Sequence, residues 1–368
     1  MAGFTLSLYP WTYTAQFTGN AAGNKAWEEQ YIEKPHLSPA EEAGLDANSQ
    51  NQFRQRRNSF PEMPFVNYTS QYGLGCFEGL KGFPQKDGSI RIFRPDLNAK
   101  RFRESMAGLH MPEFPEELFL GAVKEILRRN NELGFKPEYN AEWERNNFLS
   151  AESIYIRPFT WAEGGIGLNL SHNPSVVIIT TPVGSYFDLH ANSRAITTEM
   201  IRSTDKGTGW IKCTANYVIP IIAKMQAIAE GYMESIFLDY REQRYVEEGS
   251  SCNIFFLLKN DTLVTPELEQ RILNGINRRS IMQLAKDVGI AVEERRISID
   301  EVLSDTRESF VTGTAAGVSF LESITHQGKT AVFNGGKMGE LTRELLHTLK
   351  GIQYGAIEDR YGWMFAID

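Results

Sequence analysis

Three observations predict a mixed α/β protein built from two domains. Short apolar runs typical of strands are interspersed with amphipathic patterns typical of helices along most of the chain. The 368 residues are enough for about two domains of roughly 100 to 200 residues each. A segment containing glycine, proline and mixed polar residues interrupts the pattern near the middle. We therefore expect one domain over residues 1–182, a connector over 183–195 and a second domain over 196–368.

The first half is expected to combine strands with one long helix. Strands are expected from about residue 66 to residue 93, where Asp87-Gly88 suits a tight hairpin turn between two apolar runs. The run "EELFLGAVKEILRRNNELG" has apolar residues at helical spacing, starts with acids and stops at Gly134. "SIYIRPF" and "SVVIITTPV" then read as strands. Residues 34–62 are polar, and we expect an irregular surface excursion there.

The pattern restarts in the second half. "SIFLDY", "RYVEE" and "NIFFLL" read as strands. "RRSIMQLAKDVG" places Ile281, Leu284, Ala285 and Val288 on one face, which predicts a helix. "GELTRELLHTLKG" repeats this spacing, so a last helix is expected near the end of the chain.

The charge and hydropathy exclude several kinds of partner. A net charge of −8 repels polyanions, so nucleic acid is not an expected partner. A membrane helix needs roughly 18 uninterrupted apolar residues, and no run approaches that length. The most apolar run, "YVIPIIAKMQAIA", is broken by Pro220 and Lys224. We expect a protein that binds small molecules rather than a membrane or a nucleic acid.

The cysteines and histidines indicate no disulfide framework and no metal. Cys76, Cys213 and Cys252 are odd in number, lack CxxC spacing and fit a reducing compartment. The six histidines show no i, i+4 pair, so no metal site is expected. The N-terminus lacks the basic region and apolar core of a secretion signal. We therefore expect a cytoplasmic protein.

Four separate motifs match the requirements of one cofactor, pyridoxal phosphate. It needs a lysine for an imine, an acid facing its ring nitrogen, a donor to its phenolate oxygen, and amides with a cation around its phosphate. "GWIKCTANYV" supplies Lys212 and, five residues later, Tyr217. "VEEGSSCN" supplies an acid, "NGIN" a glycine turn before a helix, and "TGTA" a second turn. A phosphate loop at "GTGWIK" is disfavoured, because the spacing of its glycines and lysine does not fit a Walker motif.

The order of these motifs resembles the fold-type IV pyridoxal-phosphate aminotransferases, and specifically the branched-chain amino acid aminotransferases. The resemblance extends from "NYTSQYGLGCFEGLKGF" to "TGTAAG". It implies a small N-terminal α/β domain, a larger C-terminal mixed α/β domain of barrel-like form, and a homodimer. "AAGVS" lacks the CxxC pair of mammalian relatives, so thiol regulation of that kind is not expected.

The resemblance assigns roles around the cofactor ring. It implies that Lys212 forms the Schiff base, that Tyr217 lies near the phenolate oxygen, and that Glu248 holds the pyridine nitrogen protonated. A carboxylate in that place favours the pyridinium, which strengthens the electron sink. Glu247 is one residue away and faces the opposite side of a strand, so we expect it to be a solvated acid.

The resemblance also assigns the phosphate site and the substrate pocket. Its phosphate residues are Arg101 in "NAKRFRES", the amides of Ile276 and Asn277, and the hydroxyl of Thr314. Arg103 is the nearby alternative to Arg101, and Asn274 and Asn277 depart from the family's usual residues in this turn.

For the substrate, strand alternation in "YIRP" puts Tyr155 and Arg157 on one face. By resemblance, Tyr72 and Phe77 belong to an apolar pocket shared with the neighbouring subunit. The same resemblance implies that the amides of Thr314 and Ala315 receive the substrate carboxylate, helped indirectly by Arg157, Ser251 and Tyr155. The sequence assigns no residue to the γ-carboxylate of glutamate.

The activity implied is ping-pong transfer of an amino group between L-leucine, L-isoleucine or L-valine and 2-oxoglutarate. Lys212, once displaced by the substrate amine, moves the proton from Cα. Two other enzymes of the same scaffold remain alternatives, a D-amino acid transaminase and an aminodeoxychorismate lyase. Both keep Lys212, Glu248 and Arg101 but change the pocket, and "YIRP" and "FEGLKGF" argue against them. A non-catalytic protein with this fold is a more distant alternative.

Overall fold

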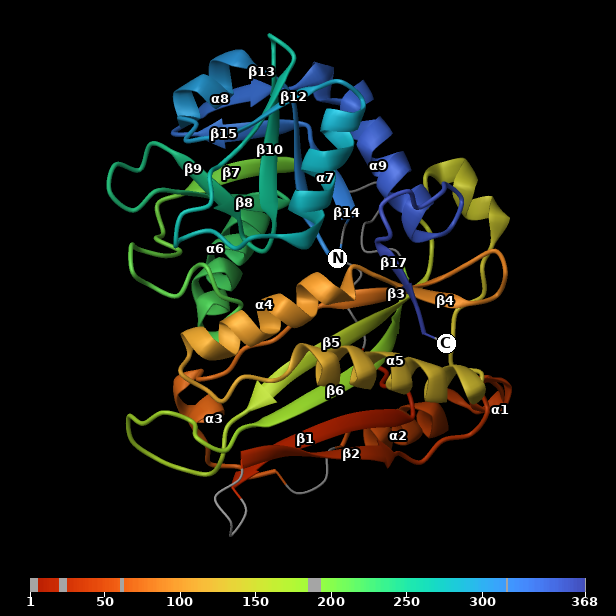
Figure 1. Ribbon diagram of the computed structural model, residues 1–368. Helices are drawn as coiled ribbons and strands as arrows, with labels where there is room; N and C mark the ends of the chain where they lie inside the picture. Colours follow the sequence, from red (N-terminus) through yellow and green to blue (C-terminus); the bar gives the residue numbers. More distant parts are fainter. Residues whose placement is uncertain (1–5, 20–24, 60–62, 185–192, 316, 368) are drawn as a thin grey trace.

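The strands of the chain form three sheets that helices cover from outside. The computed structural model describes residues 6–19, 25–59, 63–184, 193–315 and 317–367 (Figure 1). One sheet has seven strands in the order β17-β4-β3-β5-β6-β1-β2, and two have five, in the orders β12-β11-β10-β13-β14 and β16-β15-β7-β8-β9. The prediction of a mixed α/β fold is confirmed.

The seven-stranded sheet is built mainly from the first half of the chain. Helices α4 (Pro95–Gly108) and α5 (Glu116–Glu132) pack against it, and Phe102, Phe119 and Ile126 fill the core between them. Burying such side chains stabilises the fold by about 1.5–3 kcal/mol each. Its strands are β1 (Trp11–Gly19), β2 (Lys25–Glu33), β3 (Leu80–Pro84), β4 (Ile90–Phe93), β5 (Ser153–Trp161), β6 (Ser175–Val183) and β17 (Met364–Ala366).

The two five-stranded sheets lie in the second half and share a core that includes Ile236, Ile254 and Phe256. The described strands form two separate sheets and do not close into one barrel. The barrel-like form predicted for this half of the chain is therefore not a closed barrel. The strands of the first are β10 (Asn253–Leu258), β11 (Thr262–Thr265), β12 (Ala291–Glu294), β13 (Thr306–Gly313) and β14 (Gly317–Leu321). Those of the second are β7 (Arg194–Thr198), β8 (Glu234–Leu238), β9 (Val246–Gly249), β15 (Ser323–His326) and β16 (Lys329–Val332).

The helices of the second half pack against the strands of the two five-stranded sheets. The two helices predicted from helical spacing are present as α7 (Ile276–Asp287) and α9 (Glu340–Gln353), and they pack together over β13 and β14. α6 (Val218–Ala229) lies on β7 and β8, and α8 (Ile299–Asp305) lies beside β13 and β16. Short 3₁₀ helices occur at η1 (Ala141–Asn146), η2 (Thr214–Tyr217) and η3 (Asn334–Gly336).

Two sequence predictions for the first half were wrong because local capping was overlooked. Residues 34–62 contain two helices, α1 (Pro39–Gly44) and α2 (Ala47–Asn58), whose starts are capped by Ser38 and Asp46. The short helix α3 (Tyr68–Tyr72), capped by Asn67, replaces the first part of the strand expected from residue 66. The hairpin of β3 and β4 is confirmed, with Gly88 at φ 82° in its turn.

The division into domains stays a prediction. Most of the expected connector, residues 185–192, lies outside the described residues. The C-terminal strand β17 returns to pair with β4 in the sheet of the first half. Among the described helices, none combines the length and the apolar character needed to span a membrane.

Candidate active site

One cavity brings together all seven residues expected to bind the cofactor, and Ser251 with them. We call it the central cavity. Its walls come from α4, from the segment before α6, from the end of β9, from the start of α7 and from the turn after β13. The predicted residues that line it are Arg101, Lys212, Tyr217, Glu248, Ser251, Ile276, Asn277 and Thr314.

Lys212 and Tyr217 meet because a 3₁₀ turn separates them. η2 carries Tyr217 back toward the lysine, and Lys212 Nζ donates a hydrogen bond to Tyr217 Oη at 2.8 Å. The lysine backbone is held on both sides, since its N–H donates to Ser105 Oγ at 3.1 Å and its carbonyl accepts from the N–H of Phe77 at 3.1 Å. The amine is therefore placed by α4 and by the strand region around Phe77.

Glu248 is the next-to-last residue of β9 and is buried in the central cavity, 4% exposed. Its Oε1 lies 2.7 Å from Arg202 Nη1, but the two are not aligned as a hydrogen bond, so this oxygen has no hydrogen-bond donor in the described structure. Burial raises the pKa of Glu248, and the charge of Arg202 opposes that rise. Arg202 was not among the predicted site residues, because no sequence spacing links it to Glu248.

Glu247 was predicted to be a solvated acid, and this was wrong. It does face away from Glu248, but that side of β9 is buried too, and Glu247 is only 4% exposed. Its Oε1 accepts from Arg271 Nε at 2.6 Å, and Arg271 also pairs with Asp205 and Glu269. The backbone carbonyl of Arg271 in turn accepts from Arg202 at 2.9 Å. Arg271 therefore connects the surroundings of Glu248 to the loop that leads into α7.

The end of the cavity that was predicted to receive the cofactor phosphate is formed by Arg101 and the start of α7. Arg101 is bound to the fully buried Glu78 through Nε at 2.7 Å and Nη2 at 2.9 Å, and its Nη1 donates to the carbonyl of Asn274 at 2.9 Å. Within the described residues, three of the five N–H donors of the guanidinium are used, so two remain. Helix α7 starts after Gly275 with no side-chain cap, which leaves its first amides to bind an anion.

The nearby alternative, Arg103, lies outside the site. It is 41% exposed and pairs with Glu113 and Glu116 on the surface. The helical spacing of α4 turns it away from the face that carries Arg101. Of the two arginines in "NAKRFRES", the structure places only Arg101 in the central cavity.

Three of the predicted substrate residues form a cluster next to Lys212. Arg157 Nη2 donates to Tyr155 Oη at 2.7 Å, as expected for residues on one face of β5. The Arg157 guanidinium lies 4.5 Å from the centre of the Phe77 ring, and Lys212 Nζ lies 5.0 Å from the same ring. Gly79 makes room for the tyrosine, because a Cβ there would lie 2.2 Å from Tyr155 Oη.

Two other residues predicted to bind the substrate, Tyr72 and Ala315, do not line the central cavity. Tyr72 on α3 is 44% exposed, and its hydroxyl accepts from the N–H of Gly167 at 2.8 Å, outside the central cavity. The carbonyl of Ala315 accepts from Lys81 Nζ at 2.9 Å. This buried lysine was not among the predicted site residues, although it belongs to the motif "FEGLKGF". Burial lowers the pKa of Lys81, and the nearby charge of Lys350 lowers it further.

Comparison with known proteins identifies the family. Residues 75–324 match the family model described as amino-transferase class IV, which is more than half of the chain. The chain belongs to the class IV aminotransferases. Among the described residues, no group of three or more His, Cys, Asp or Glu side chains could hold a metal ion.

Relatives of this class IV aminotransferase have both sequence and structure in common with it. The chain is 38% identical over 301 residues to a probable branched-chain-amino-acid aminotransferase of Staphylococcus epidermidis, covering 79% of this chain and 80% of the relative. The solved branched-chain amino acid aminotransferase of T.th. with pyridoxamine 5'-phosphate is 29% identical, with a TM-score of 0.70 over 83% of this chain and 94% of that one. The same enzyme complexed with N-(5'-phosphopyridoxyl)-L-glutamate is 28% identical, with a TM-score of 0.69 and the same coverage.

Replacing Glu78 with glutamine should destabilise this aminotransferase strongly. The charge of Arg101 outweighs the effect of burial and holds the pKa of Glu78 below its ordinary value. Removing the carboxylate leaves the Arg101 guanidinium buried without a counter-charge, which costs about 3–5 kcal/mol. Urea unfolding of cofactor-free protein at neutral pH measures this loss.

The matched control for Glu78→Gln is Glu113→Gln, which removes one exposed partner of Arg103, an arginine on the same helix α4 as Arg101. That change should cost less than about 1 kcal/mol. The cost of Glu78→Gln should shrink as the pH falls, because the wild-type carboxyl loses its stabilising charge below its unfolded pKa of 4.5. Equal losses in the two variants would show that the buried ion pair is not what stabilises this region.

Glu247 should give the protein a pH-dependent stability. Burial raises its pKa from 4.5 to about 7, although Arg271 opposes the shift. The folded state therefore binds the proton more tightly than the unfolded state, and stability falls as the pH rises from 4.5 to about 7. The contribution is up to about 3 kcal/mol.

Urea unfolding across that range should show a steeper decline for the wild type than for Glu247→Gln. The substitution keeps the size of the side chain but cannot ionise. Parallel curves for the two proteins would contradict the raised pKa.

Proposed function

We propose that the protein is a branched-chain amino acid aminotransferase that uses pyridoxal 5'-phosphate. It transfers the amino group between L-leucine, L-isoleucine or L-valine and 2-oxoglutarate. The observation that carries the proposal is the meeting of Lys212, Tyr217, Glu248 and Arg101 around one cavity. The names of the relatives support the choice of substrates within the family.

The residues of the central cavity fit the cofactor at each of its polar groups. The buried Oε1 of Glu248 lacks a hydrogen-bond donor, which the protonated ring nitrogen of the cofactor provides. Tyr217 Oη, next to Lys212, suits the phenolate oxygen. The two unused N–H donors of Arg101, with the uncapped start of α7, suit a phosphate dianion.

When bound, pyridoxal phosphate accepts the electron pair left on the substrate Cα after that carbon loses its proton. The other parts of the reaction depend on Lys212, Glu248 and Arg202. Lys212 holds the cofactor and moves the proton as a general base. Glu248 maintains the charge on the ring, and the neighbouring Arg202 favours the ionised form of Glu248.

The substrate pocket combines aromatic walls with polar groups at one end. Phe77 and Tyr155 bound the space beside Lys212, and burying a branched aliphatic side chain against them contributes about 1.5–3 kcal/mol. The amides of Thr314 and Ala315 are proposed to bind the substrate carboxylate, with Ser251 nearby. The complex of the T.th. enzyme with a phosphopyridoxyl-glutamate supports glutamate as the second amino donor.

Initial rates on a panel of amino donors test this function. With 2-oxoglutarate as acceptor, L-leucine, L-isoleucine and L-valine should react at least about tenfold faster than D-alanine, because one apolar group in a pocket is worth about 1–3 kcal/mol. A preference for D-alanine would instead establish the D-amino acid transaminase. Formation of pyruvate from 4-amino-4-deoxychorismate, without amino transfer, would establish the lyase.

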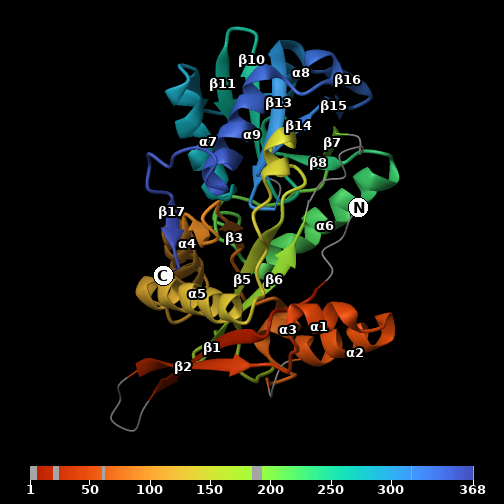
Figure 2. The same ribbon diagram turned by 90° about the vertical axis from the view of Figure 1, so that its right-hand side faces the viewer.

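The protein is also proposed to be a cytoplasmic homodimer. α6 carries a row of exposed apolar side chains, and it lies at the edge of the molecule in Figure 2. The loop that Tyr72 holds carries Ile166 and Leu168, which are 76% and 93% exposed. Exposed apolar patches of this kind mark protein interfaces. The exposed apolar residues of α6 are Val218, Ile219, Ile221, Ile222 and Met225.

Replacing Ile221 with aspartate should therefore separate the dimer. Light scattering should give half the wild-type mass, and the rate should fall at least about tenfold if the partner completes the pocket through Tyr72. Val332→Asp on β16 is the control, because Val332 is 61% exposed and Ile221 is 60% exposed. A wild-type protein that is already monomeric and fully active would contradict the dimer.

A further inference from the structure

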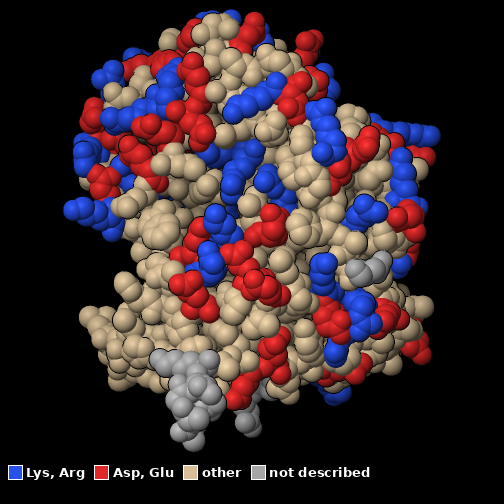
Figure 3. All heavy atoms as spheres, viewed as in Figure 1, with Lys and Arg blue, Asp and Glu red and all other residues tan. Residues whose placement is uncertain are grey.

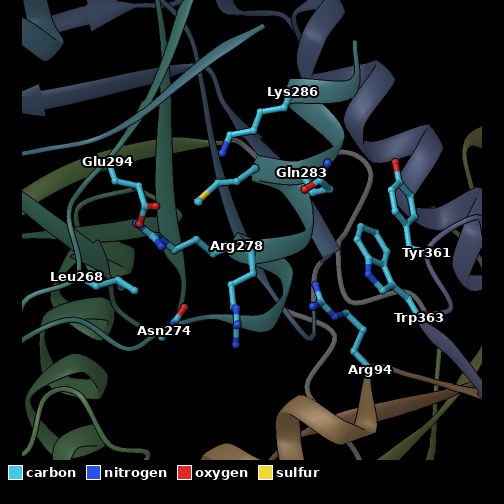
Figure 4. A pocket seen from close by; sticks show the side chains of 11 residues that line it. Arg94, Leu268, Asn274, Arg278, Gln283, Lys286, Glu294, Tyr361 and Trp363 are labelled. Carbon is cyan, nitrogen blue, oxygen red and sulfur yellow. The ribbon is translucent and has the colours of Figure 1, made fainter. Parts of the chain in front are cut away.

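A second, larger cavity lies on the outer side of α7, away from Lys212. It encloses about 450 Å³, within the range of about 300–1,000 Å³ typical of small-molecule sites. We call it the outer cavity. In Figure 4, Arg94 rises from the start of α4 toward α7, with Trp363 and Tyr361 on one side and Leu268 and Glu294 on the other. Its lining residues are Arg94, Leu268, Asn274, Arg278, Arg279, Met282, Gln283, Lys286, Glu294, Tyr361 and Trp363.

The outer cavity is strongly cationic. Four of its lining residues carry a positive charge and one, Glu294, a negative charge. Arg278 already binds Glu294, at 2.9 Å, and the carbonyl of Pro266, so the one acid is paired within the wall. Lys and Arg side chains gather over α7 in the middle of the face shown in Figure 3. The remaining cations have no such partner in the described cavity wall.

Arg94 is held in place at the base of this cavity. Its guanidinium lies 4.9 Å from the centre of the Trp363 ring, and Nη1 donates to Ser280 Oγ at 2.8 Å. Burial and the neighbouring positive charge of Arg279 lower the pKa of Arg94, while Asp96 and Asp359 act in the opposite direction. A side chain fixed by a ring and a hydroxyl loses little freedom when it binds a ligand.

Arg279 and Lys286 lie one above the other on the exposed side of α7, seven residues apart. In the part of the chain that the structure describes, no carboxylate lies within ion-pair distance of either side chain. Most surface arginines of the chain, by contrast, do pair with acids. Two unpaired cations above a fixed third cation make a site for more than one negative charge.

We propose that the outer cavity binds a small dianion, a phosphate monoester or a dicarboxylate, through Arg94, Arg279 and Lys286. The fork of a guanidinium matches the oxygen pairs of either group. The outer cavity also borders the central cavity, where the cofactor is proposed to bind. Asn274 lines the outer cavity with its side chain, and its carbonyl accepts the hydrogen bond from Arg101. A molecule bound outside α7 is thus adjacent to the residues that meet the cofactor phosphate.

Isothermal titration with two probes tests the proposal. Inorganic phosphate and succinate are titrated separately into protein loaded with pyridoxal phosphate, so that the phosphate end of the central cavity is filled. At least one probe should bind with a saturable, millimolar or tighter affinity. Arg279→Ala and Lys286→Ala should each weaken it about tenfold, the effect of losing one charge-assisted hydrogen bond. Both residues are exposed, so the fold should tolerate these changes.

Arg145→Ala is the matched control, because it removes the same charge from a surface arginine that is 78% exposed and outside the cavity. Its affinity should equal that of the wild type. The preferred probe identifies the class of ligand, phosphate or dicarboxylate. The proposal is overturned if neither probe binds at millimolar concentration, or if all three variants weaken binding equally.

The same titration on cofactor-free protein separates this proposal from the proposed function. The effect of Arg279→Ala should persist there, whether or not the central cavity binds pyridoxal phosphate.

Discussion

Replacing Lys212 with alanine should abolish amino transfer. Lys212 is the only lysine among the described residues that line the central cavity, and its amine donates to Tyr217 Oη, so no neighbouring amine there can take over the proposed proton transfer. Loss of a general base costs on the order of 10²- to 10⁴-fold in rate, and loss of the cofactor's covalent attachment adds to that. Steady-state rates with L-leucine and 2-oxoglutarate measure the effect.

Two controls separate chemistry from folding in that experiment. Lys329→Ala removes an exposed lysine from β16, far from the central cavity, and should leave the rate unchanged. The thermal unfolding midpoint of cofactor-free Lys212→Ala should stay close to that of the wild type, because the backbone contacts of Lys212 to Ser105 and Phe77 remain. A folded Lys212→Ala protein with more than a tenth of the wild-type rate would refute the assignment.

Replacing Glu248 with glutamine should produce the second-largest loss. A neutral amide cannot hold a charged ring nitrogen, so the bound cofactor becomes a weaker electron sink. We expect a fall in kcat on the order of 10²- to 10³-fold, the size found when one electrostatic contact to a transition state is removed. The KM for L-leucine should change little, because Glu248 is assigned to the cofactor rather than to the substrate.

Glu247→Gln is the sharpest control for this prediction. The two acids are adjacent and equally buried, but Glu247 faces Arg271 on the other side of β9. Its replacement should alter stability and its dependence on pH while keeping kcat within about threefold. If Glu247→Gln lowers kcat as much as Glu248→Gln, the assignment of the ring-nitrogen acid is wrong.

The sequence predicted some parts of the site that depend on residues close together in the chain. The resemblance to a family, rather than a spacing rule, paired Tyr217 with Lys212, and in the structure a 3₁₀ turn brings the two side chains to 2.8 Å. The alternation of β5 placed Tyr155 beside Arg157. Helical spacing predicted α5, α7 and α9, because each buries one apolar face.

Long-range contacts were beyond the reach of such patterns. Arg202 reaches Glu248 only because β7 and β9 belong to one sheet, on either side of β8. The alternation of side chains along β9 correctly predicted that Glu247 and Glu248 face opposite sides of the strand. It could not show that Arg271, which is distant in sequence, covers the side that Glu247 faces. The helices α1 and α2 bury few residues, and their caps rather than an apolar face mark their positions.

We propose that the cavity around Lys212 binds pyridoxal phosphate and transfers amino groups from branched-chain amino acids. The absorbance spectrum of the purified protein with this cofactor, recorded after L-leucine and again after 2-oxoglutarate, tests both halves of this proposal. A visible band should disappear with L-leucine and return with 2-oxoglutarate. A protein that shows no visible band, or a band that only D-alanine removes, would contradict it.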